Sequence, residues 1–172
     1  MPPQPRPPGG DDSPWYRQFW PWFLIALPGS PGNVVPVREV AGTPIDQAFL
    51  GTCTNGRLED LRVAADILKD HQVNQGFQLN IVPTSRLIMQ KAADEGILGA
   101  LIKAGAFITS PSCDYCFGHI GTMTAGQKAI STGTLNVPGR MGSPDSEIYL
   151  ASPASVAAAA LEGQLVDPRR FL

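Results

Sequence analysis

Short apolar runs alternate with helix-patterned segments from about residue 33 onward, and this alternation is the strongest constraint on the fold. The runs that predict strands lie at residues 45–51, 78–83, 106–109, 128–132 and 147–151. Strands separated by helices form parallel sheets, because the chain must cross over before it can re-enter the sheet in the same direction. The sequence therefore predicts an α/β domain, a three-layer α/β/α arrangement around a mostly parallel sheet.

The helical segments carry start and stop signals that support this interpretation. Helices are expected at residues 57–69, from a cap at Ser85 to about Glu95, at residues 97–103, and over a body at residues 156–161. The last of these follows Ser152 and Pro153, which are favoured as N-cap and first helical residue, and Gly163 is expected to end it. No internal repeat and no phosphate-binding glycine loop is found.

The first 32 residues differ in composition from the rest of the chain. Residues 1–12 are rich in Pro and Gly and cannot bury enough apolar surface to become ordered. Residues 15–27 are rich in aromatic side chains, yet this run is shorter than the ~20 residues needed to cross a bilayer. We expect a poorly ordered extension over residues 1–32 and one domain over residues 33–172. Residues 15–27 are interpreted as a short packing segment or the edge of a truncated or rearranged reading frame, with a membrane-surface or partner-docking role as the alternative.

Charge and cysteine content exclude several classes of protein. The formal net charge of -2 gives no electrostatic basis for binding nucleic acid or an anionic membrane. The three cysteines are an odd number, so a disulfide framework would leave one unpaired. Free or metal-bound thiols in a reducing compartment are the better interpretation, and a cytoplasmic location is expected.

The positions of the cysteines point to metal chemistry. Cys53 lies between a predicted strand and the start of a helix, a location that favours the thiolate form. Cys113 and Cys116 form a Cys-x-x-Cys pair just after another predicted strand. Three thiolates cannot bind all four irons of a cubane cluster, and an open iron acts as a Lewis acid. This pattern favours cluster-assisted chemistry over electron transfer.

Other interpretations of these residues stay open on the motif alone. A Cys-x-x-Cys pair also occurs in redox and zinc sites, and His119 could complete a zinc site together with Cys53. A lone cysteine such as Cys53 is usually a small buried hydrophobic residue. His71 follows a predicted helix and is expected to be solvated.

Three sequence blocks together resemble the aconitase superfamily, in particular the C-terminal part of the large subunit of 3-isopropylmalate dehydratase and homoaconitase. They are residues 34–60, which contain Gly-Thr-Cys-Thr-Asn-Gly-Arg, the later Cys-x-x-Cys pair, and residues 139–169, which contain Tyr-Leu-Ala-Ser-Pro-Ala. The blocks occur in the family's order, and the resemblance covers roughly residues 33–169.

The resemblance implies an iron–sulfur hydro-lyase that acts on a 2-hydroxy di- or tricarboxylate. Cys53, Cys113 and Cys116 would each bind one iron of a [4Fe-4S] cluster, and the fourth iron would hold the substrate. The family's upstream large-subunit domains and the small swivelling subunit, which carries the serine base, would be partners. No catalytic residue is therefore assigned within this chain.

The sequence departs from the family at positions that bear on substrate binding. Between the two paired cysteines it has Asp-Tyr instead of Gly-Pro. Thr134 and Leu135 stand where the family has a substrate-binding Asn and Arg, whereas Asn136 and Arg140 are retained. Asn136 and Arg140 are the expected substrate-binding residues, with Arg140 as a bidentate carboxylate clamp.

Three hypotheses follow from the sequence. The chain is an enzyme part that assembles with the missing domains, a non-catalytic iron–sulfur or zinc module, or an inactive truncated remnant. Under the first hypothesis, Leu135 indicates a substrate with an apolar substituent, such as an alkyl-malate, rather than citrate.

Overall fold

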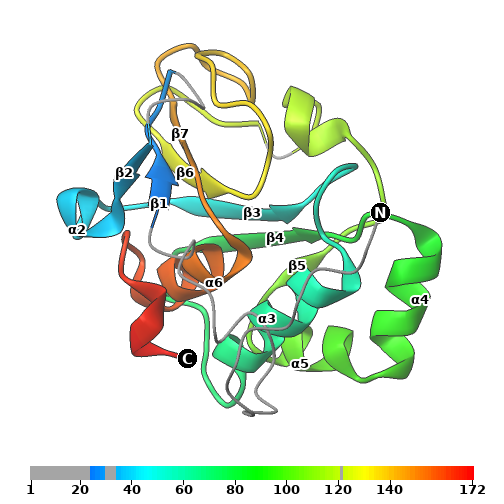
Figure 1. The fold of residues 1–172 in the computed structure, drawn as a ribbon. Helices are drawn as coiled ribbons and strands as arrows, with labels where there is room; N and C mark the ends of the chain where they lie inside the picture. Colours follow the sequence, from blue (N-terminus) through cyan, green and yellow to red (C-terminus); the bar gives the residue numbers. More distant parts are fainter. Residues whose placement is uncertain (1–23, 30–33, 121) are drawn as a thin grey trace, which may run out of the picture.

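The fold is built on a seven-stranded sheet within the residues that the computed structural model describes, which are 24–29, 34–120 and 122–172 (Figure 1). The strand order is β2-β1-β7-β6-β3-β4-β5. The strands are β1 (Leu24–Ala26), β2 (Val34–Pro36), β3 (Gln47–Gly51), β4 (Gln78–Val82), β5 (Phe107–Ile108), β6 (Lys128–Ser131) and β7 (Glu147–Leu150). Strands β3 to β7 are parallel, and β1 is antiparallel to both of its neighbours. The predicted α/β class with a mostly parallel sheet is confirmed.

The helices follow the predicted segments closely. They are α2 (Val37–Val40), α3 (Leu58–Leu68), α4 (Arg86–Asp94), α5 (Ile97–Lys103) and α6 (Pro153–Glu162), with 3₁₀ helices η2 (Asp114–Phe117) and η3 (Pro168–Arg170). Ser85 Oγ accepts a hydrogen bond from Ile88 N at 3.2 Å, and Ser152 Oγ accepts one from Ser155 N at 3.2 Å. Both predicted N-caps are therefore confirmed, because each hydroxyl satisfies a backbone N–H that has no partner inside its helix.

Alternate residues of each central strand point to opposite faces of the sheet. Ala48 and Leu50 of β3, and Leu79 and Ile81 of β4, are buried in the large core beneath helices α3, α5 and α6. Phe49 of β3 points the other way, into a smaller core. This period of two is the ordinary pleat of a strand that is covered on both faces.

The second face of the sheet is covered by the connections after β5 and β6. Figure 1 shows η2 and the long loops before and after β6 on the side of the sheet away from α3, α5 and α6. In the described residues this third layer consists of loops and η2 rather than α-helices. Tyr115 of η2 and Met123 and Met141 of the loops fill the smaller core against Phe49. This layer carries Cys113, Cys116, Leu135 and Arg140, whereas Cys53 lies on the loop after β3.

The N-terminal extension is described only in part. Residues 1–23 and 30–33 lie outside the described residues, and so does most of the predicted poorly ordered extension. Within residues 15–27, β1 joins the sheet beside β7, with Ala26 opposite Leu150 in the register. Ile25 is fully buried in the large core. Across the described ranges, no helix has the length and apolar character needed to cross a membrane.

Candidate functional site

The first cysteine lies on a tight loop at the carboxyl end of β3. A Cβ atom at Gly51 would lie 1.8 Å from the Val82 carbonyl oxygen, so only glycine allows β3 and β4 to approach this closely here. Thr52 follows with a φ of 105°, and its N–H donates to the Val82 oxygen at 3.1 Å. Thr84 Oγ1 donates to the Thr52 carbonyl at 3.1 Å. These contacts turn the chain sharply and leave Cys53 exposed at the tip of the loop.

The other two cysteines lie in the loop layer, one just before the 3₁₀ helix η2 and one within it. Cys113 is the residue before the helix, and its carbonyl accepts a hydrogen bond from Cys116 N at 3.0 Å. Tyr115, between them, is buried, and its ring centroid lies 5.6 Å from that of Phe49. The Tyr115 ring therefore anchors the Cys-x-x-Cys turn on the sheet.

The fold brings thiols from distant parts of the chain together. Cys53 Sγ and Cys113 Sγ share a hydrogen bond at 2.9 Å, and all three cysteines are free of disulfides. The hydrogen bond with Cys113 is the main cause that raises the pKa of the Cys53 thiol, followed by burial. Burial raises the pKa of the Cys116 thiol. Cysteines bind metals as thiolates, so metal binding would release the protons of the Cys53 and Cys116 thiols.

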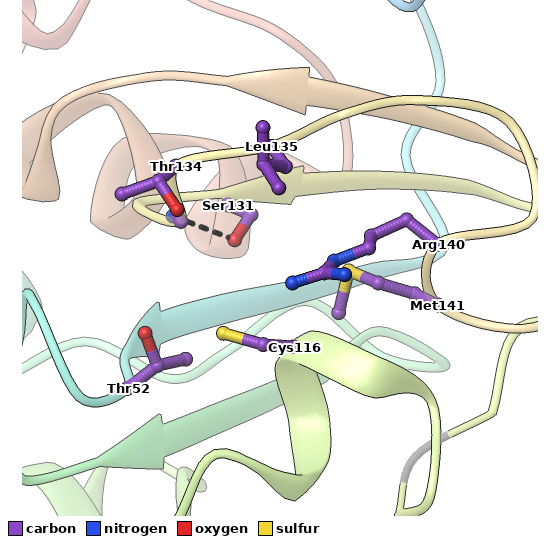
Figure 2. Close-up of a pocket in the computed structure, with 8 residues that line it drawn as sticks. Thr52, Cys116, Ser131, Thr134, Leu135, Arg140 and Met141 are labelled. Atoms are coloured by element: carbon purple, nitrogen blue, oxygen red, sulfur yellow. Dashed lines mark hydrogen bonds between the residues drawn. The ribbon is translucent and has the colours of Figure 1, made fainter.

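A small cavity of about 10 Å³ connects the cysteine turn with the loop after β6. Its lining residues are Thr52, Cys116, Ser131, Gly133, Thr134, Leu135, Arg140 and Met141. Figure 2 shows the guanidinium of Arg140 extending toward Cys116, with Leu135 on the neighbouring loop. Arg140 and Leu135, which sequence reasoning selected for substrate binding and specificity, thus border the same cavity as one predicted metal ligand.

Within the described part of the chain, the guanidinium of Arg140 is not neutralised by a carboxylate. Its Cζ atom lies 4.2 Å from the centroid of the Phe117 ring, a cation–π contact. Among the described residues it forms no salt bridge with a carboxylate. An arginine that stacks on an aromatic ring while lacking an anionic partner can still bind a carboxylate through its N–H groups.

Asn136 lies apart from this cavity. Its side chain is buried, and its Nδ2 donates to the carbonyl of Leu27 at 2.5 Å. The Asn136 carbonyl accepts a hydrogen bond from Gly29 N at 3.1 Å. In this structure Asn136 therefore ties the loop after β6 to the segment after β1, and its predicted role in substrate binding stays a prediction.

Neither histidine joins the three cysteines in a common metal site. His119 is exposed, and its Nδ1 lies 3.8 Å from Asp114 Oδ1. His71 is exposed after α3, as expected. The described residues contain no set of three or more His, Cys, Asp or Glu side chains arranged around one metal ion. A cubane cluster differs from such a site, because each thiolate binds a different iron, and the three free, converging thiols are a donor set that fits it.

Comparison with known proteins places the chain in a family. The profile of the aconitase family (aconitate hydratase) matches residues 32–163. The chain belongs to the aconitase family. The 3-isopropylmalate dehydratase large subunit 1 of Methanopyrus kandleri is 48% identical over 149 residues, which are 86% of this chain and 36% of that protein. A probable methanogen homoaconitase large subunit of Methanothermobacter thermautotrophicus is 45% identical over 147 residues, 85% of this chain and 34% of that protein.

These matches confirm the family resemblance that the sequence blocks indicated. The chain spans about a third of the length of the curated relatives that it matches. Two features of this aconitase-family site were not predicted from sequence, the stacking of Phe117 on Arg140 and the conformation of Thr52. No sequence pattern marked either feature, because a β-branched residue such as Thr52 is expected to have a negative φ.

Proposed function

We propose that this chain is the cluster-binding part of an iron–sulfur hydro-lyase of the 3-isopropylmalate dehydratase large-subunit type. Its substrate would be a 2-hydroxy di- or tricarboxylate. The observation that carries the proposal is the meeting, at the carboxyl ends of parallel strands, of three free thiols and an arginine that has no carboxylate partner among the described residues. Open α/β sheets usually bind ligands at this edge. The names of the relatives support the same reaction class.

In this proposal Cys53, Cys113 and Cys116 hold a [4Fe-4S] cluster. When bound, such a cluster would supply a Lewis-acidic iron for the removal and re-addition of water. The protein's part is to present the three thiolates. The tight turns at Gly51 and η2 support this, since they leave Cys53 exposed and Cys113 and Cys116 only half-buried.

Arg140 is the proposed carboxylate-binding residue, and Leu135 sets the substituent that is accepted. A guanidinium binds a carboxylate in bidentate fashion, which a lysine ammonium cannot do. Leu135 is 42% exposed and borders the same cavity, so an apolar group is available beside the charge. This combination supports an alkyl-malate as substrate over a citrate-like acid with a further carboxylate.

The proposed enzyme needs chains or domains beyond these 172 residues. Relatives are roughly three times as long as the matched segment, so the remaining large-subunit domains are proposed partners. A small subunit is a further proposed partner, because the relatives are named as large subunits. We place the assembled enzyme in the cytoplasm, where thiols stay reduced.

Anaerobic reconstitution with iron and sulfide tests the cluster. We expect about four irons and four sulfides per chain and a broad visible absorbance from thiolate-to-iron charge transfer. Replacing Cys53, Cys113 or Cys116 with Ser should abolish both. The matched control is Thr54→Ser, an exposed hydroxyl on the same loop. Stoichiometric zinc with no iron after reconstitution would contradict the proposal.

Ligand-observed NMR on the iron-loaded chain tests the substrate class. Arg140→Lys should weaken binding of 2-isopropylmalate about 10- to 100-fold, the factor expected from losing a hydrogen bond to a charged group worth ~1.5–3 kcal/mol. Leu135→Arg should shift the preference from 2-isopropylmalate toward citrate. Iron content should not change in either variant. Unchanged affinity in Arg140→Lys would show that Arg140 is only a surface cation.

A further inference from the structure

Thr52 adopts a backbone conformation that its side chain disfavours. Its φ of 105° lies in the left-handed half of conformational space, where a β-branched residue is a genuine outlier. The conformation is imposed from both sides, since Thr52 N donates to Val82 O at 3.1 Å and its carbonyl accepts from Thr84 Oγ1 at 3.1 Å. Gly51 N is held in turn by Thr132 Oγ1 at 2.8 Å. Strain that is held in place in this way is typical of functional sites.

Among the described residues, the hydroxyl of Thr52 also makes no hydrogen bond of ordinary geometry, although it lies within reach of the Cys116 sulfur. The residue is 2% exposed, and within the described part of the chain its Oγ1 is buried without a hydrogen bond. Buried polar groups are nearly always hydrogen-bonded. An unpaired hydroxyl in a strained residue therefore indicates that it gains a hydrogen bond when the site is occupied. Strain and an unsatisfied donor are independent observations on one side chain.

The cavity limits which atom that partner can be. Its volume of about 10 Å³ leaves room beside Thr52 for one water molecule at most, so a substrate bound at Arg140 and Leu135 would not reach this hydroxyl. The partner of the hydroxyl is then a water molecule or one of the groups that line the cavity. Ser131 Oγ already accepts a hydrogen bond from Gly133 N at 2.9 Å. Cys116 lines the same cavity, and Figure 2 shows its sulfur directed toward the side where Thr52 lies. Its sulfur is the lining atom that gains negative charge when it binds a metal.

We propose that the Thr52 hydroxyl donates a hydrogen bond to the Cys116 sulfur when that sulfur is a thiolate ligand of the iron–sulfur cluster. This inference rests on the proposed function, since it assumes that Cys116 binds iron. Hydrogen bonds to cluster sulfurs raise the reduction potential and stabilise the ligated state. Thr52 is therefore a positioning residue that tunes the cluster and does not touch substrate.

The test compares Thr52→Val with wild type after anaerobic reconstitution. Val keeps the shape and β-branching of Thr, so the backbone conformation is retained while the donor is lost. We expect a full complement of iron, a more negative midpoint potential by spectroelectrochemistry, and about tenfold faster release of iron to a chelator, as for the loss of one hydrogen bond to a charged group. Thr52→Ser should restore the wild-type values.

The matched control is Thr54→Val, two residues along the same loop. Thr54 is exposed, and its hydroxyl accepts from Asn55 Nδ2 at 3.2 Å, so its removal should leave the potential unchanged. Thr52→Gly gives a second route should the valine variant fail to fold. Glycine accepts a positive φ, so the metal-free Gly variant should melt at a higher temperature than wild type while showing the same shift in potential.

Failure of the inference can be told apart from failure of the proposed function. The inference alone is overturned if the wild-type chain assembles the cluster and the Thr52→Val or Thr52→Gly variant has the same midpoint potential and the same rate of iron release as wild type. A wild-type chain that binds no iron refutes the proposed function and the inference with it.

Discussion

The contact between the cysteine turn and the loop that carries Arg140 depends on a glycine. Gly118 ends η2 with a φ of 67°. A Cβ atom there would lie 2.7 Å from Met141 C and 2.9 Å from Gly142 N. These are backbone atoms, which cannot rotate away as a flexible side chain would. Gly118→Ala must therefore push the loop that contains Arg140 away from η2.

The expected loss of stability has two parts. A non-glycine residue in the left-handed region costs ~1 kcal/mol, and an overlap with packed backbone costs ~1–3 kcal/mol. Together these predict that Gly118→Ala lowers the free energy of unfolding by ~2–4 kcal/mol, a large share of the ~5–15 kcal/mol typical of a domain. Gly96 provides a matched control, because its φ is 76° and no atom lies within 4 Å of a Cβ built on it. Gly96→Ala should lose only the ~1 kcal/mol that comes from the left-handed conformation.

Urea unfolding followed by circular dichroism measures both variants under the same conditions. The Gly118→Ala loss should exceed the Gly96→Ala loss by ~1–3 kcal/mol, with similar denaturant slopes. Equal losses would refute the reasoning, because they would mean that the two loops are free to separate without cost.

Three further changes test other parts of the structure. The Tyr149 hydroxyl donates a hydrogen bond to Glu147 at 2.8 Å, which is the main cause that lowers the pKa of Glu147. The resulting stabilisation of the fold is present above the ordinary pKa of 4.5 and is lost as pH falls through the lower folded value. Glu147→Gln should therefore flatten the acid side of a plot of melting temperature against pH. Ser152→Ala should cost ~1 kcal/mol in urea unfolding, because the α6 cap is lost, and an unchanged midpoint would contradict the capping role. Leu61→Ala removes a fully buried side chain from the large core and should cost ~2.7–5 kcal/mol by the same assay, whereas a loss below 1 kcal/mol would contradict its packing.

The parts of the fold that local chemistry decides were predictable from sequence. The bounds of α5 agree residue for residue with the predicted helix at 97–103. The caps at Ser85 and Ser152 were predictable because each involves a side chain and a backbone N–H only three residues away. The parallel direction of the central strands, but not their order in the sheet, was predictable from their alternation with helices, since parallel strands require crossovers.

The parts that were not predictable depend on contacts between distant segments. The burial of Ile25 requires β1 to pair with a strand more than 100 residues away, and an isolated aromatic-rich run does not reveal that pairing. The predicted strand at 106–109 shortens to β5, because an edge strand has only one neighbour. The sequence indicated Cys53 and Cys113 as candidate metal ligands. Their contact, however, arises from the turn of η2 over the sheet, which no local pattern predicts.

The two faces of the sheet differ in how much apolar surface they bury. The helical face holds the large core, whereas Cys113, Cys116 and Arg140 belong to a layer whose own core is small. Segments with little buried surface open most readily in the native state, so amide hydrogen exchange should be faster in this layer than in α3 or α6. A ligand bound there would slow that exchange, because it stabilises only the closed form. The proposed cluster site thus lies in the layer that is expected to open more readily, and its occupancy can be followed through exchange rates without any assay of turnover.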